Sequence, residues 1–243
     1  MSFLELRQVT KRFPGVVALD GVSLSVQCGE VVALIGENGA GKSTLMKILG
    51  GVHQADAGSI LIDSKPVHIA SVADSIALGI GFIHQELNVL PNLDVAANVF
   101  LGREPLWGGP LCLIDRKKLY RQTEPLLAML GLDISPKTML SRLSLAQQQM
   151  VEIAKALSLN ARIIIMDEPT SSLTLKETDR LLATIASLRE KDVGIIYISH
   201  RLGEVDKCAD RVVVLRSPVG EAAPSNYTFI YRWKGVAEVF QCD

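Results

Sequence analysis

The sequence has little excess charge of either sign, because its 25 Lys and Arg residues almost cancel its 26 Asp and Glu residues and leave a formal net charge of -1. A chain so close to neutrality has no overall attraction for nucleic acid, so no nucleic-acid partner is expected. Cysteine is also scarce, and Cys28, Cys112, Cys208 and Cys242 form no CxxC pair. Their spacing argues against a disulfide framework and against a zinc site, and reduced thiols are expected.

Long apolar runs are absent as well. Stretches such as 31–35, 163–166 and 212–215 are far shorter than the roughly 20 residues that a membrane-spanning helix needs. The start of the chain, MSFLELRQVTKRF, also lacks the basic segment, apolar centre and small-residue cleavage site of a secretory signal. These features predict a protein of the cytosol whose apolar runs are buried strands.

What the sequence does contain is an alternation of short apolar runs with amphipathic stretches, over 243 residues of which 48% are apolar. This pattern predicts one large α/β domain with a largely parallel central sheet. A helix is expected over 41–49. Strands are expected at Leu4–Val9, Val22–Val26, Glu30–Ile35, Gly81–Ile83, Arg162–Met166, Val193–Ile198 and Arg211–Leu215.

Between residues 86 and 158 the pattern becomes helical, which predicts an inserted helical lobe. Asp115 is placed to cap a helix through Leu130 and Ser144 to cap another through Leu157, as short polar side chains do at helix starts. The segment Glu104–Pro110 is rich in proline and glycine and is expected to be a surface loop.

The composition changes after Arg216. The domain is therefore expected to span 1–216, and residues 217–243 are interpreted as an atypical C-terminal tail that is not the natural continuation of the domain. Alternating aromatic and β-branched residues allow a strand at Tyr227–Trp233 within it. Deleting the tail is expected to leave nucleotide binding intact.

The segment GENGAGKST lies between an expected buried strand and an expected helix and matches the phosphate-binding P-loop pattern. Its glycines allow the backbone N–H groups to point at phosphate oxygens, and the helix N-terminus adds partial positive charge. Lys42 is expected to reach the β and γ phosphates and Ser43 to ligate Mg²⁺. The candidate nucleotide-binding residues are Gly36, Glu37, Asn38, Gly39, Ala40, Gly41, Lys42, Ser43 and Thr44. The alternative is a plain structural loop.

Two adjacent carboxylates, Asp167 and Glu168, follow an apolar strand in IIIMDEP. They are costly there unless a cation or a proton-transfer task holds them. Beside a P-loop, Asp167 is expected to hold the magnesium shell, and Glu168 is expected to act as the base that orients water toward the γ-phosphate. The alternative is an acidic pair that caps a helix.

Five further segments resemble those of the ABC ATPases and occur in that family's order. LSLAQQQMVEIAKAL, from Leu143, resembles the signature segment with its serine at Ser144, and Gln85 resembles the Q-loop glutamine that contacts both nucleotide and metal. His200 resembles the switch histidine, SSLT at 171–174 the D-loop, and Phe13 the aromatic residue that stacks on adenine. The resemblance covers 3–216 and implies ATP and Mg²⁺ as cofactors, a RecA-like P-loop core with an antiparallel β subdomain, and catalytic roles for Lys42, Glu168 and His200.

Each of these residues also has a simpler interpretation. Ser144 is compatible with an ordinary helix N-cap, Gln85 with surface polarity, His200 with a hydrogen-bonded histidine at a strand end, and Phe13 with a core position. The sequence alone leaves these alternatives open.

The sequences of these segments are most similar to those of the first ABC domain of bacterial monosaccharide importers. That group commonly departs from other ABC ATPases as this chain does, with Leu145 and Ala146 after the serine and Thr174 in place of aspartate. The resemblance implies a peripheral protein at the cytoplasmic face of the membrane. Its implied partners are transmembrane permease subunits, a second ABC domain and, indirectly, a periplasmic sugar-binding protein, and the chain is expected to be half of each catalytic centre.

Two other classes of protein share part of this motif set. A non-transport ABC ATPase of chromosomes or ribosomes shares the catalytic motifs, but chromosome types insert long coiled coils where only 101 residues separate Lys42 from Ser144. A P-loop kinase or GTPase predicts neither LSLAQQQ nor His200. No NKxD motif occurs in the sequence, which favours ATP over GTP.

Overall fold

A six-stranded sheet forms the centre of the computed structural model, which describes residues 2–84, 87–171, 173–216 and 227–232. Its strand order is β12-β11-β3-β10-β9-β6. All neighbours pair in parallel except β12, which runs antiparallel to β11. The strands are β3 (Val31–Gly36), β6 (Ile80–Ile83), β9 (Ile163–Asp167), β10 (Gly194–Ile198), β11 (Arg211–Arg216) and β12 (Tyr227–Arg232).

The predicted parallel sheet is therefore confirmed, with each of these strands within two residues of its expected limits. The reason is that β3, β9 and β10 are continuous apolar runs buried on both faces, which is typical of parallel strands covered by other layers. The strand allowed at 227–233 also forms, from Tyr227 to Arg232.

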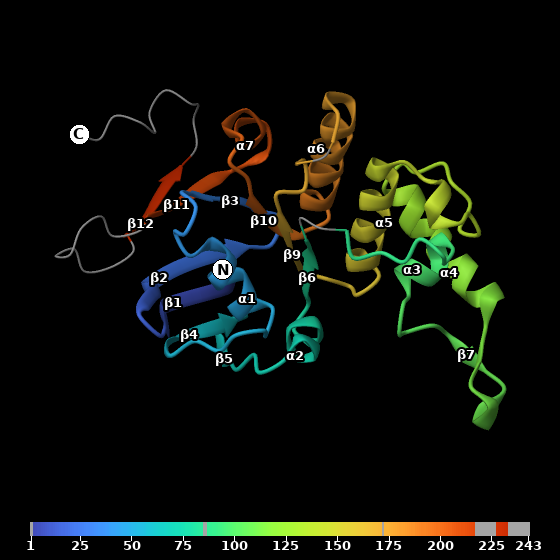
Figure 1. The fold of residues 1–243 in the computed structure, drawn as a ribbon, viewed down its shortest axis with the longest axis horizontal. Coiled ribbons are helices and arrows are strands. Elements are labelled where there is room, and N and C mark those ends of the chain that lie inside the picture. The colour runs from blue at the N-terminus through green and yellow to red at the C-terminus, as the bar shows by residue number, and fades with distance from the viewer. Residues whose placement is uncertain (1, 85–86, 172, 217–226, 233–243) are drawn as a thin grey trace.

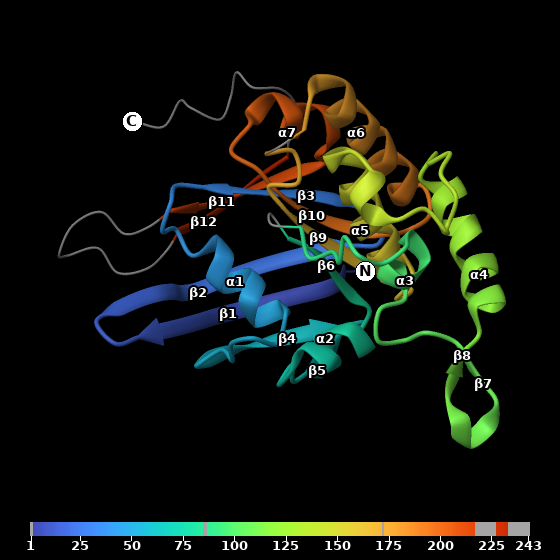
Figure 2. The same cartoon turned by 45° about the vertical axis from the view of Figure 1, so that its right-hand side comes forward.

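A second, antiparallel sheet covers one face of the first, as Figure 2 shows. Its order is β2-β1-β4-β5, and its strands are β1 (Ser2–Phe13), β2 (Val16–Gln27), β4 (Ala57–Ile62) and β5 (Lys65–Val67). Strands β1 and β2 extend well beyond the predicted 4–9 and 22–26. Register shifts interrupt their pairing, and such bulges break the apolar alternation from which strand limits are inferred.

Helix α1 (Lys42–Leu49) is enclosed between the two sheets, and its residues Leu45, Met46, Ile48 and Leu49 join their common apolar core. The opposite face of the six-stranded sheet packs into a second core with helices α6 (Leu175–Arg189) and α7 (Leu202–Cys208). Helix α2 (Val72–Ala77) precedes β6. These layers hold the carboxyl ends of the parallel strands in fixed positions.

The inserted lobe contains α3 (Val95–Val99), α4 (Arg116–Met129), the 3-10 turns at Gly109–Leu111 and Leu140–Arg142, and α5 (Leu145–Leu157). Both predicted caps are present: Asp115 accepts a hydrogen bond from the Lys118 N–H, and Ser144 forms a reciprocal capping box with Gln147.

The expectation of a simple surface loop at 104–110 was incomplete. Leu106–Trp107 forms strand β7, which pairs with β8 (Leu113–Ile114) in a two-stranded ribbon. Strands this short have too few residues for an alternation to be recognised in the sequence. None of the helices in the described part of the chain is both long and apolar enough to cross a membrane.

Candidate nucleotide-binding site

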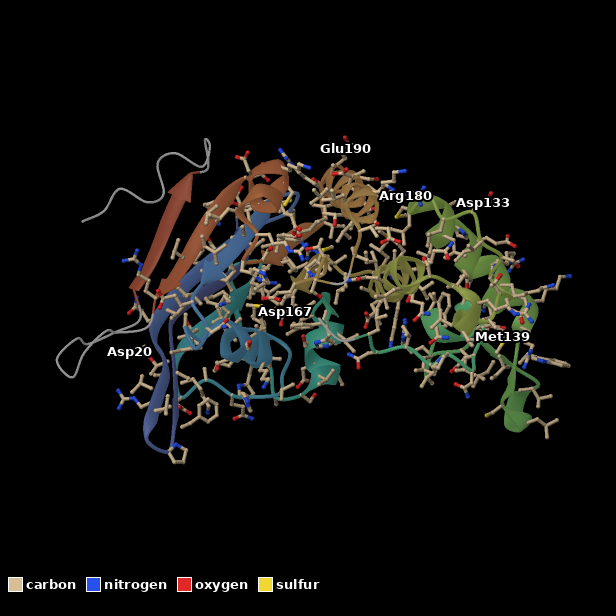
Figure 3. The ribbon with its side chains drawn as sticks, turned by 45° about the horizontal axis from the view of Figure 1, so that its top comes forward. Asp20, Asp133, Met139, Asp167, Arg180 and Glu190 are labelled. Atoms are coloured by element: carbon tan, nitrogen blue, oxygen red, sulfur yellow. The ribbon has the colours of Figure 1, made fainter. Side chains whose placement is uncertain are left out.

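The chemistry-bearing residues gather where β3, β9 and β10 end. Leu34 of β3 and Asp167 of β9 both lie opposite Ile198 of β10 in the parallel register. The segments that follow these strands are consequently neighbours at one edge of the sheet, and Figure 3 shows Asp167 near the middle of the molecule. The carboxyl edge of a parallel sheet is the usual place for a ligand site.

The P-loop links β3 directly to α1, as predicted. Glycine is required at Gly36, where a Cβ would collide with the Leu215 carbonyl, and Gly41 precedes the helix with a φ of +95°. No side chain in the described residues caps the N-terminus of α1, and its first turn has no acidic residue. The helix therefore presents its partial positive charge to whatever occupies the loop, which fits an anion such as a phosphate.

Lys42 reaches back over this loop. Its Nζ donates hydrogen bonds to the carbonyl oxygens of Gly36 at 2.6 Å and Glu37 at 2.9 Å. Burial lowers the pKa of Lys42, and the negative charges of Glu168 and Asp167 oppose that shift. The structure thus places the lysine close to the two carboxylates that the sequence associated with it.

Asp167 is partly buried at the end of β9. Burial raises its pKa, and the nearby Glu168 raises it further, whereas His84 and Lys42 act in the opposite direction. A carboxylate in this setting is stabilised by a cation. His84, which the sequence analysis did not single out, precedes Gln85 and belongs to this electrostatic environment.

Glu168 and His200 contact each other, with 3.1 Å between the carboxylate Oε1 and the imidazole Nδ1. Glu168 has a left-handed backbone, with φ of +45°, and its N–H donates to the Ile198 carbonyl at 3.0 Å. Left-handed geometry is unfavourable for a residue with a Cβ, and such strain recurs at active sites. The helix-capping alternative does not hold for this pair, because Thr174 and Glu177 form the capping box of α6.

Two of the predicted metal ligands, Ser43 and Asp167, line the same cavity. His84 also lines this cavity, which has a volume of about 370 Å³. A hydroxyl and a carboxylate facing one space fit Mg²⁺, which prefers oxygen ligands and takes few of them from protein. No cluster of three or more His, Cys, Asp or Glu side chains suited to a metal occurs in the described ranges. The third predicted ligand, Gln85, lies outside the described residues.

Two predicted nucleotide contacts do not join this group. Ser144 lines a different cavity, of about 620 Å³, with Gln147 and Arg180. Phe13 ends β1 with 37% of its surface exposed and its ring edge-on to His53, at 5.3 Å between centroids. The core alternative for Phe13 is therefore wrong, while its stacking on adenine stays a prediction.

Further residues connect the site to the rest of the molecule. Gln149 of α5 donates a hydrogen bond to the Pro169 carbonyl, directly after Glu168. Buried Glu204 of α7 accepts from the Thr170 hydroxyl at 2.6 Å and the Tyr197 hydroxyl at 2.8 Å. Gln149 lies inside the segment that resembles the signature helix, but neither residue carries a sequence pattern that separates it from ordinary polar residues.

The chain matches known proteins over most of its length. The family model described as "ABC transporter" matches residues 19–171. A putative ribose/galactose/methyl galactoside import ATP-binding protein of Burkholderia ambifaria is 56% identical over 215 residues, covering 88% of this chain and 41% of that protein. The galactose/methyl galactoside import ATP-binding protein MglA 1 of Photobacterium profundum is 48% identical over 225 residues, covering 92% and 45%.

Two solved structures share the fold. The ADP conformation of MJ1267, an ATP-binding cassette of an ABC transporter, superimposes with a TM-score of 0.78 at 29% identity, covering 88% of this chain and 87% of that one. The dimeric structure of MJ0796, a bacterial ABC transporter cassette, gives 0.72 at 26% identity, covering 88% and 94%.

The fold and site are those of a P-loop nucleoside triphosphatase with an inserted helical lobe. The chain belongs to the ABC transporter family, and membership implies ATP binding, in agreement with the prediction. It spans about two fifths of the length of curated relatives such as the Burkholderia protein.

Proposed function

We propose that this chain is an ATP-binding and ATP-hydrolysing half of the motor of a monosaccharide importer. The observation that carries the proposal is the convergence of Lys42, Asp167, Glu168 and His200 at one edge of the parallel sheet. The sugar follows from the names of its relatives, which are import ATP-binding proteins for ribose, galactose and methyl galactoside.

The chain's own residues divide the work. The N-terminus of α1 and Lys42 bind the phosphates, and Lys42 exchanges the carbonyls of Gly36 and Glu37 for phosphate oxygens. Ser43 and Asp167 hold Mg²⁺, which supplies charge neutralisation when bound. Glu168 accepts a hydrogen bond from the attacking water and orients it, while His200 holds the carboxylate in place through their 3.1 Å contact.

The same proposal places the chain at the cytoplasmic face of the membrane, bound to permease subunits and paired with a second ABC domain. A periplasmic sugar-binding protein acts with it only indirectly. ATP-driven closure of two such domains would then drive the permease.

Replacing Lys42 with alanine tests the proposal. We expect Mg-ATP binding to weaken by about 1.5 to 3 kcal/mol, because a charge-assisted phosphate contact is lost. Calorimetric titration of wild type, Lys42→Ala and the exposed control Lys191→Ala measures it. Equal affinity in all three proteins would remove Lys42 from the phosphate site.

A further inference from the structure

A short ribbon projects from the helical lobe, away from both sheets, as Figures 1 and 2 show. It consists of β7, the turn at Gly109–Leu111 and β8, and we call residues 106–114 the β7–β8 ribbon. Leu106 pairs with Ile114 and Trp107 with Leu113, and the Asp115 N–H closes the base by donating to the Pro105 carbonyl at 2.7 Å. The ribbon is therefore a formed element with its own hydrogen bonds.

Its side chains are apolar and exposed. Five residues are between 46% and 73% exposed, namely Leu106, Trp107, Leu111, Leu113 and Ile114. Large apolar side chains rarely gather on a free surface, and such patches mark sites of interaction with a protein or a membrane. Positions 105–114 contain no charged residue, so water-exposed charge does not offset the apolar surface.

A group of basic residues adjoins the ribbon. Arg116, Lys117, Lys118 and Arg121 are all exposed in the first turns of α4, immediately after β8. Among the ion pairs that the described residues form, none involves these four. Cations at a helix N-terminus oppose the helix dipole, so helix stability does not explain their position.

We infer that the β7–β8 ribbon is a membrane-contact element that inserts Trp107 and its aliphatic neighbours into the headgroup region of an anionic bilayer, with the basic residues of α4 binding lipid phosphates. Tryptophan with leucine and isoleucine favours the boundary between headgroups and acyl chains, and nearby lysine and arginine add attraction to anionic lipid.

The chemistry of the ribbon favours lipid over a protein partner. Protein interfaces carry about one hydrogen bond per 100 to 200 Å² and surround their apolar centre with polar groups. From 105 to 114 the side chains with hydrogen-bonding groups are only the Trp107 indole, which has a single N–H donor, and the weakly polar Cys112 thiol. The boundary between headgroups and acyl chains suits this composition, because the indole N–H can reach headgroup oxygens while the aliphatic side chains leave water.

This inference does not rest on the proposed ATPase function, because the ribbon contributes no residue to the nucleotide site. Direct lipid contact would add to whatever attachment a permease provides. Loss of ATP binding and loss of lipid binding are therefore separable in experiments.

The two tryptophans of the sequence are Trp107 and Trp233, so Trp233→Phe leaves Trp107 as the one indole reporter. We expect its emission to shift to shorter wavelength when the protein is mixed at low salt with vesicles containing phosphatidylglycerol. Lipids brominated on their acyl chains should quench it. Vesicles of phosphatidylcholine alone should bind more weakly, and added salt should weaken binding to the anionic vesicles.

Variants separate the contributions. In the Trp233→Phe background, Leu111→Ser should weaken vesicle binding about tenfold, and Lys117→Glu with Lys118→Glu should remove most of its salt dependence. The matched control is Leu175→Ser, since Leu175 is 86% exposed at the start of α6. ATP binding should be unchanged in all of them, which shows that they fold.

An emission spectrum that anionic vesicles do not move would overturn the inference. So would equal binding of Leu111→Ser and Leu175→Ser. A spectrum that responds to a detergent-solubilised permease but not to vesicles would also overturn it and assign the ribbon to a protein partner.

Discussion

Lys42 donates hydrogen bonds to the Gly36 and Glu37 carbonyls. These contacts compete with the phosphate binding proposed for this lysine. Two neutral carbonyls satisfy part of the ammonium, whose pKa burial lowers. A phosphate offers negative charge as well as acceptors, so binding it gains more than the loop carbonyls supply. The resting contacts keep the lysine over the loop and reduce the side-chain entropy lost on binding.

Among the described residues, Glu152 carries the one buried side-chain oxygen or nitrogen that lacks a hydrogen-bond partner. It is 3% exposed on α5, with Oε1 accepting from the Asn88 N–H at 3.1 Å and Oε2 lacking a partner within the described residues. Burial is the main cause that raises its pKa. A charge buried in this way costs stability.

The raised pKa of Glu152 predicts how the stability of Glu152→Gln relative to wild type depends on pH. Because the folded-state pKa lies above the unfolded value, the wild type is most stable below the unfolded pKa and loses stability as pH rises through the folded one. We therefore expect the stability of Glu152→Gln relative to wild type to increase as the pH rises from 4 to 8. Urea unfolding across that range measures the difference, and a pH-independent difference between the two proteins would contradict it.

Ser144, at the start of α5, has two possible roles that substitutions can distinguish. Its capping box is present, so Ser144→Ala should cost about 1 kcal/mol of stability. Aspartate is an equally good N-cap, and Ser144→Asp should therefore unfold at the same denaturant concentration as wild type.

The two variants should differ in nucleotide chemistry. If Ser144 contacts the phosphate of an ATP held by another domain, the aspartate repels that phosphate and abolishes ATP-dependent association, whereas alanine only weakens it. Both Ser144 variants are made in the Glu168→Gln background, which should bind ATP without hydrolysing it. Sedimentation in the presence of Mg-ATP then measures association. Normal association of Ser144→Asp would leave Ser144 as a helix cap alone.

The elements that could be predicted from sequence are those with a strong local cause. Buried runs such as 163–167 and capped helices such as α5 were found within two residues. Strands β4 and β5 were not, because β4 begins with exposed residues and β5 has only three. Their pairing with β1 and with each other depends on contacts far apart in sequence.

The site shows the same division. Lys42, Asp167, Glu168 and His200 each follow an identifiable strand, so their convergence was predictable from the parallel sheet. The contacts of Glu204 with Thr170 and Tyr197 join three segments of the chain. They could not be predicted, because no one of these segments has a sequence pattern that indicates them.

At the scale of the whole molecule, the two candidate phosphate-binding features lie in different cavities, one lined by Ser43 and Asp167 and the other by Ser144. The binding site of an ATP held at the P-loop of one domain would then be completed by the Ser144 cavity of another domain. Closure between two domains would exclude water and bring charge-stabilising groups to the transferring phosphoryl group.

We accordingly expect the isolated chain to bind ATP well and to hydrolyse it slowly, with a rate per chain that rises in proportion to protein concentration while monomers predominate, since two chains must meet. Steady-state ATPase measurements over a hundredfold dilution series test this. Glu168→Gln should bind ATP without hydrolysing it, and Ser144→Arg should abolish the concentration-dependent rate by blocking the second domain's contact. A brisk rate that is independent of concentration and insensitive to Ser144→Arg would show that one chain contains a complete site, because only a self-sufficient centre turns over at the same speed however rarely two chains collide.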